Sequence, residues 1–143
     1  MKLIKDKYKY PELQRVENEL GRFYIDSEGQ EVPSVTNVLS TTSDQSGIDE
    51  WKRRVGLEEA ERVLQESSSI GSNVHNALEN YLQDKEWKII NDGSYISKTS
   101  ILILESFINN LINDINEVWG LEAGLILDGL YAGTADCLSL IHI

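Results

Sequence analysis

Two apolar segments lie on either side of Asp128-Gly129, and this pattern constrains the fold more than any other feature of the sequence. Residues 121–127 read LEAGLIL, and a second segment begins at Leu130. An aspartate-glycine pair between two such segments is typical of a tight β-hairpin turn. Because an isolated hairpin is only marginally stable in water, we expect further strands to complete a sheet around it.

The part of the chain before this hairpin is predicted to be mainly helical. Residues 22–32 are expected to form a small hairpin with glycine in its turn, and Ser34 to cap a short helix that begins at Val35. Apolar residues spaced three and four apart predict further helices over residues 48–55, 57–65, 72–83 and 99–118, with Gly120 ending the last one. This order of elements indicates an α/β fold that is α+β at its start.

The charge of the chain bears on its partners. The 143 residues suit a single domain, and their net charge of −11 by itself argues against a nucleic-acid partner. A basic N-terminal segment, residues 1–20, and the cluster Lys52, Arg53 and Arg54 weaken that argument. A solvated helix face explains the cluster more simply than contact with phosphate.

Cysteine content and hydropathy exclude other classes. The single cysteine, Cys137, excludes an iron–sulfur cluster or a disulfide framework held within this chain, and it fits a reducing compartment. The longest apolar run, Ile101–Leu104, is far too short to span a membrane. We therefore expect no membrane partner.

Asp136 is the first candidate for chemistry, at the end of the tetrapeptide GTAD. Gly133 and Ala135 leave space around its carboxylate, and aspartate is depleted in strand interiors. A polar side chain on the outward face of a strand is the simpler alternative. The spacing alone does not choose between the two.

Glu122, on the strand before the turn, is the second candidate. A loop with an odd number of residues centred on Gly129 places Glu122 opposite Asp136, whereas a two-residue loop directs the two carboxylates to opposite faces. A β-bulge would change this register again. If the carboxylates do face each other, a cation between them removes their repulsion, and Mg²⁺ is the usual cation.

His75 is the third candidate, because it precedes Glu79 by one turn on the expected helix 72–83. Gly71, just before that helix, permits a close approach of backbone. A surface histidine beside a helix-stabilising glutamate is the simpler interpretation. The sequence contains no phosphate-binding glycine loop, nucleophile elbow, HExxH or CxxC motif.

Five motifs in this order resemble those of the PD-(D/E)XK nuclease superfamily. Within it, the chain is similar to RecB-type exonucleases related to the mitochondrial genome maintenance exonuclease and its phage and bacterial relatives. The resemblance covers about residues 22–137. The motifs are PSVTNVL (33–39), IDEWK (48–52), GSNVHNALENYL (71–82), WGLEAGL (119–125) and YAGTADCL (131–138).

The resemblance implies a restriction-endonuclease-like core and a set of catalytic and metal-binding residues. It assigns the family's metal-site histidine to His75, its glutamate to Glu122 and its first core aspartate to Asp136. It implies Mg²⁺ or Mn²⁺ as the cofactor and DNA, mainly single-stranded, as the partner. Residues 22–118 then precede the core, and residues 119–137 are its first strands.

The resemblance also implies a second acid, then one residue, then a lysine on the next strand. No lysine follows Lys98. We therefore expect this single nuclease domain to be truncated and its core incomplete. On this interpretation the 143 residues bind metal weakly and cleave little or nothing.

Residues 138–143, LSLIHI, equal one translation of the transposon-end adapter used in common sequencing libraries. We expect this tail to be adapter-derived, so that His142 is not a ligand. An ordinary apolar strand is the alternative interpretation.

The sequence thus predicts a metal-dependent DNA exonuclease that acts in repair, recombination or phage replication. The resemblance places it in the cytoplasm of a bacterial or phage-infected cell. Two alternatives stay open: a non-catalytic helical module that binds DNA or another partner, and a structure-specific endonuclease of the same superfamily.

Overall fold

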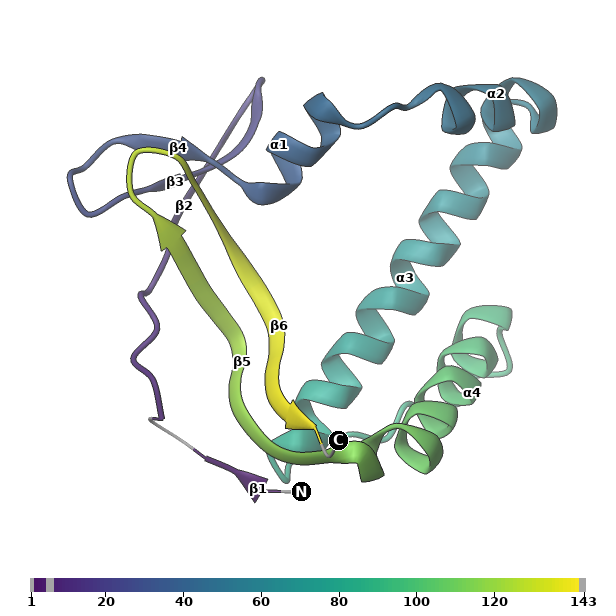
Figure 1. The fold of residues 1–143 in the computed structure, drawn as a ribbon. Coiled ribbons are helices and arrows are strands. Elements are labelled where there is room, and N and C mark those ends of the chain that lie inside the picture. The colour runs from purple at the N-terminus through teal and green to yellow at the C-terminus, as the bar shows by residue number, and fades with distance from the viewer. Residues whose placement is uncertain (1, 5–6, 142–143) are drawn as a thin grey trace. The chain divides into compact units, whose positions relative to one another are not determined.

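The computed structural model describes residues 2–4 and 7–141, which form a mixed α+β structure with four α-helices and two three-stranded sheets. The chain divides into two compact units (Figure 1). The helical unit consists of residues 2–3, 47–118 and 140–141. The hairpin unit consists of residues 4, 7–46 and 119–139. No helix in the described part of the chain has the length and hydropathy to cross a membrane. This composition of elements agrees with the predicted α/β class.

The helical unit is built on two helices that pack against each other. They are α3 (Leu57–Leu82) and α4 (Tyr95–Asn110), and α2 (Ser46–Val55) precedes them. Figure 1 shows α4 beside α3. After the 3₁₀ helix η1 (Ile112–Asp114) comes strand β5 (Ile115–Leu127), whose first part pairs in parallel with the short strand β1 (Lys2–Leu3).

The prediction of two helices over residues 57–65 and 72–83 is wrong, because α3 runs without interruption from Leu57 to Leu82. Serine is only a moderately poor helix former, and one internal glycine costs about 1 kcal/mol relative to alanine. Burial of Val74, Ala77 and Leu82 on α3 outweighs that cost. Gly71 therefore lies inside the helix and does not start it.

The prediction of a helix over residues 99–118 is also wrong. Helix α4 begins earlier, where the Ser94 hydroxyl accepts a hydrogen bond from the Ser97 backbone N–H at 3.1 Å, and it ends at Asn110. Four poor helix formers end the helical segment, namely Asn109, Asn110, Asn113 and Asp114. The residues that follow suit a strand, and Val118 is fully buried there.

The hairpin unit contains the small hairpin predicted from the sequence. Strands β2 (Gln14–Asn18), β3 (Gly21–Ile25) and β4 (Glu31–Pro33) form an antiparallel sheet in that order. Strand β2, inside the predicted basic N-terminal segment, was not expected. The predicted cap is confirmed: Ser34 precedes α1 (Val35–Thr42), and its hydroxyl accepts a hydrogen bond from an N–H of the first turn at 3.0 Å.

Strands β5 and β6 (Tyr131–Ile141) form the second hairpin of this unit, again as predicted. A β-bridge between Ser34 and Ala132 joins β6 to the end of β4. Tyr24, Val32 and Ala132 form the core between the two hairpins. His142 and Ile143 lie outside the described residues, and the adapter origin of residues 138–143 stays a prediction.

Two glycines of β5 let an N-terminal segment lie directly against this strand. A Cβ at Gly120 would come within 2.8 Å of the Tyr10 ring, and one at Gly124 within 2.4 Å of the Pro11 carbonyl oxygen. The Tyr10 hydroxyl also donates a hydrogen bond to the Trp119 carbonyl at 3.2 Å. Residues 10–13 therefore fix the position of β5 in the hairpin unit.

The carboxylate of Asp26 holds the turns of the two hairpins together. It accepts hydrogen bonds from the backbone N–H groups of Glu28 at 3.0 Å and Gln30 at 2.8 Å within its own turn, and of Gly129 at 3.0 Å in the other. Ser27 adds a hydroxyl bond to Asp128 at 2.8 Å. The Gln30 bond, followed by those from Gly129 and Glu28, lowers the pKa of Asp26 below its ordinary value of 3.8, although burial acts in the opposite direction.

We predict that Asp26→Asn lowers the thermal midpoint of the hairpin unit by several degrees near neutral pH, because three backbone N–H groups lose their anionic acceptor. Since the pKa of Asp26 is lowered in the folded state, its stabilisation is complete above pH 3.8 and is lost as the pH falls below that value. Thermal unfolding of both proteins, near neutral pH and at about pH 2, measures the difference.

Glu28→Gln, which removes an exposed acid from the same turn, is the matched control and should leave the midpoint nearly unchanged. Two results would contradict the role of Asp26. One is an equal loss of stability in both variants. The other is a deficit in Asp26→Asn that persists undiminished in acid.

Candidate functional site

Glu122 and Asp136 lie close together on the β5–β6 hairpin. A carboxylate oxygen of Glu122 lies within 4.8 Å of a carboxylate oxygen of Asp136, and both residues are exposed. Strand β5 ends at Leu127 and β6 begins at Tyr131, so residues 128–130 form a three-residue connection. The Leu130 N–H donates a hydrogen bond to the Leu127 carbonyl at 3.0 Å, so the predicted Asp128-Gly129 pair lies at the centre of this turn. The short carboxylate separation agrees both with an odd-numbered loop and with a β-bulge, the two alternatives from the sequence that place the carboxylates together.

The backbone at Glu122 adopts a conformation that L-amino acids disfavour. Its φ is +47°, and among the described residues only Asp84 shares a positive φ outside glycine. A left-handed residue costs roughly 1–2 kcal/mol relative to an ordinary conformation. The next two residues, Ala123 and Gly124, are both buried, so the alternation of β5 breaks at Glu122. Strained residues of this kind cluster at functional sites, and here the strain sets the direction of the Glu122 side chain.

The pair of carboxylates has the chemistry of a cation site. Two negative charges at this distance repel each other by about 1 kcal/mol in water, and a cation between them turns the repulsion into attraction. Carboxylate oxygens on an open surface suit Mg²⁺ or Mn²⁺, which keep several waters as ligands. Desolvation by its neighbours and the Asp136 charge raise the pKa of the exposed Cys137 thiol, although a hydrogen bond with Ser139 acts in the opposite direction, so a soft thiolate ligand is disfavoured beside this pair.

His75 lies on the exposed surface of α3, in the helical unit. The predicted helix at this position is confirmed, and Glu79 follows one turn later. The Glu79 carboxylate accepts a hydrogen bond from Gln83 at 2.8 Å. His75 and the carboxylate pair thus belong to different units, and the role of His75 as a metal ligand stays a prediction.

Lys52, Arg53 and Arg54 form the last turn of α2, also in the helical unit. Basic side chains in this position interact favourably with the partial negative charge at a helix C-terminus. Arg53 and Arg54 are exposed, whereas Lys52 is half-buried. A structural role therefore accounts for the cluster, and contact with phosphate stays a prediction.

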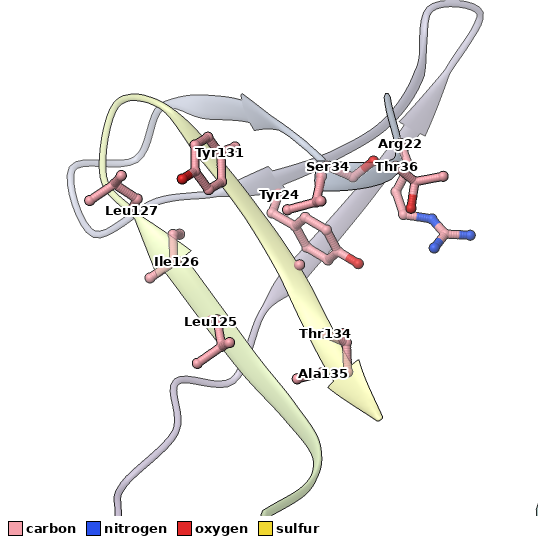
Figure 2. A pocket seen from close by; sticks show the side chains of 12 residues that line it. Arg22, Tyr24, Ser34, Thr36, Leu125, Ile126, Leu127, Tyr131, Thr134 and Ala135 are labelled. Atoms are coloured by element: carbon pink, nitrogen blue, oxygen red, sulfur yellow. The ribbon is translucent and has the colours of Figure 1, made fainter. Parts of the chain in front are cut away.

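The hairpin unit also contains a cavity of about 370 Å³ that sequence reasoning missed. Strands β3, β5 and β6 and the start of α1 line it, and Figure 2 shows the side chains around it. Its walls are mainly apolar, from residues such as Leu125 and Ile126, with Tyr24, Thr36 and Thr134 as polar members. No local motif marks such a cavity, because its lining comes from segments about a hundred residues apart.

Comparisons of the chain with models of known protein families, with curated proteins and with solved structures found no match. The features of the chain that bear on function are thus the strained Glu122, its partner Asp136 and the cavity in the same unit.

We predict that Glu122→Gly is about 1 kcal/mol more stable than Glu122→Ala, because glycine adopts the positive φ without a steric penalty. Asn116, an exposed position on the same strand without a positive φ, gives the matched comparison. There the order should reverse, with glycine less stable than alanine by about 0.5–1 kcal/mol. Urea unfolding of the four variants measures both differences. An alanine preference at both positions would show that Glu122 is not strained.

Proposed function

We propose that this chain carries the first metal-binding strands of a DNA exonuclease of the PD-(D/E)XK type. The observation that supports this most directly is the carboxylate pair Glu122 and Asp136, within 4.8 Å on adjacent strands. The order of the sequence motifs adds the resemblance to RecB-type exonucleases. In this proposal β5 and β6 are the first strands of the nuclease core.

Each candidate residue has a defined task in the proposal. Glu122 and Asp136 bind Mg²⁺ or Mn²⁺ through carboxylate oxygens, and His75 supplies a third ligand as the resemblance implies. A bound divalent ion lowers the pKa of a water molecule and neutralises charge on a phosphate oxygen. The strained backbone at Glu122 holds its carboxylate in the position to bind before the ion arrives.

The reaction is hydrolysis of a phosphodiester bond at a single-stranded DNA end. The acid-x-Lys element that completes such a site has no counterpart after Asp136 in these residues, since no lysine follows Lys98. The proposal therefore expects the 143 residues to bind metal weakly and to need that element for turnover. Lys52, Arg53 and Arg54 would contact phosphate, and the site of action would be the cytoplasm of a bacterial or phage-infected cell.

We predict that Asp136→Asn and Glu122→Gln each weaken Mn²⁺ binding to the 143-residue chain at least ~10-fold, since each removes one ligand. Isothermal titration calorimetry measures the affinity. The matched control is Glu105→Gln, an exposed acid on α4, which should bind Mn²⁺ like the unchanged chain. Equal affinity in all four proteins would place the ion elsewhere and contradict the proposal.

The same proposal predicts the outcome of a cleavage assay on a longer protein, in which the acid-x-Lys element follows these residues. Asp136→Ala should abolish Mg²⁺-dependent digestion of end-labelled single-stranded DNA, while DNA binding persists. Retained turnover would overturn the assignment. Digestion of circular as well as linear single strands would indicate an endonuclease instead.

A further inference from the structure

The cavity in the hairpin unit lies next to the carboxylate pair along the chain. Gly133, Thr134 and Ala135 line it, and Asp136 follows them directly on β6. Strand residues are spaced by about 3.3 Å, so the cavity begins roughly one to three residue lengths from Asp136. On the other strand, Leu125 lines the cavity three residues after Glu122. A ligand in the cavity therefore borders the strand segments that carry the pair.

The hydroxyl of Tyr24 is a polar group without a partner at this cavity. The Tyr24 residue is 6% exposed, and among the residues that the structure describes its hydroxyl makes no hydrogen bond. Figure 2 shows the Tyr24 ring between Ile126 and Thr134, with its hydroxyl on the side of Thr134. Because the Arg22 Nε is the only buried side-chain polar atom without a partner among the described residues, the Tyr24 hydroxyl is reached by solvent, and a ligand in the cavity can replace that water as its hydrogen-bond partner.

The lining is suited to a flat, mostly apolar group with a few polar edges. Aromatic rings come from Tyr24 and Tyr131, and aliphatic walls from Leu125 and Ile126. The hydroxyls of Thr36 and Thr134 add polar atoms at separate points. Bases stack on aromatic side chains without requiring a particular sequence, and their edges accept and donate hydrogen bonds.

One cationic side chain lies at the cavity, and a nearby carboxylate offsets part of its charge. Arg22 is the one charged residue among those that line it, in a protein with a net charge of −11. The Arg22 Nε is buried and makes no hydrogen bond in the described structure, although it lies 3.5 Å from a Glu17 carboxylate oxygen. Because the buried Arg22 Nε lacks a hydrogen-bond acceptor, an occupant that carries acceptor oxygens, such as phosphate, is favoured over a neutral apolar one.

We propose that this cavity binds the base of the terminal nucleotide of a DNA strand, with Tyr24 as the residue that recognises it. The inference rests on the proposed nuclease function, and it adds how the strand end is held. The base enters the cavity between β3 and the β5–β6 hairpin, and its phosphate then lies toward Glu122 and Asp136. An end would be preferred to an internal position because the cavity accepts a base that can turn away from the strand.

The experiment measures binding of the 143-residue chain to a fluorescent single-stranded octanucleotide by anisotropy, in EDTA and in Mn²⁺. Three further oligonucleotides carry one abasic residue at the 5′ end, at the 3′ end or in the middle. We expect the abasic residue at one end to weaken binding roughly tenfold, as for the loss of one stacked base, and the internal abasic residue to have little effect.

Two variants test the cavity itself. Tyr24→Phe removes only the hydroxyl and should weaken binding of the intact strand several-fold, yet leave binding of the end-abasic strand unchanged. Ala135→Leu fills the cavity and should abolish the difference between intact and end-abasic strands. Tyr95→Phe, an exposed tyrosine on α4, is the matched control and should behave like the unchanged chain.

The outcomes separate this inference from the proposed function. Equal binding of intact and end-abasic strands by the unchanged chain, or an equal loss for both in Tyr24→Phe, would overturn the base-binding cavity. In that case, Mn²⁺ affinity that still depends on Asp136 would continue to support the proposed metal site. Conversely, DNA binding could depend on the terminal base while Mn²⁺ affinity is unchanged by substitution of Glu122 and Asp136. That result would support base binding in the cavity and contradict the proposed nuclease function.

Discussion

The hydrogen bonds to the Asp26 carboxylate are the interaction on which the hairpin unit depends. Two hairpins that are distant in sequence meet at their turns, and a two-stranded hairpin alone is only marginally stable in water. The Asp26 carboxylate joins them by accepting N–H groups from both turns, and the Ser27–Asp128 bond reinforces that contact. The small core of Tyr24, Val32 and Ala132 then forms between them. The joined turns thus help to hold β5 and β6 against β3, where the cavity lies.

The same unit stores strain where the proposed chemistry takes place. Glu122 keeps a positive φ in the middle of a strand, although a glycine there would be more stable. The close approach of Tyr10 and Pro11 to Gly120 and Gly124 holds β5 on both sides of that residue. A conformation of this kind persists only when the surroundings determine it, and its use in the proposal is to position one carboxylate opposite Asp136.

Local signals allowed several elements to be predicted from the sequence, whereas tertiary contacts decided the others. Glycine in each turn and the Ser34 cap act within a few residues, so both hairpins and the start of α1 were found. The break predicted around Gly71 failed because packing of α3 outweighed weak local propensities. The strand that replaces the end of the predicted helix 99–118 gains from pairing with β1, which no local pattern reveals. The register of the carboxylates was open because loop length and a β-bulge both affect it, and the cavity was missed because its walls come from distant segments.

The central claim is that Glu122 and Asp136 together bind a divalent cation, and nuclear magnetic resonance with Mn²⁺ tests it most directly. The paramagnetic ion broadens the amide signals of residues near its binding site. With Mn²⁺ well below one equivalent, the signals around Glu122 and Asp136 on β5 and β6 should broaden first and together. Broadening that starts elsewhere, for example along the exposed acidic residues Glu58 and Glu59 at the start of α3, with these signals unaffected, would contradict the account.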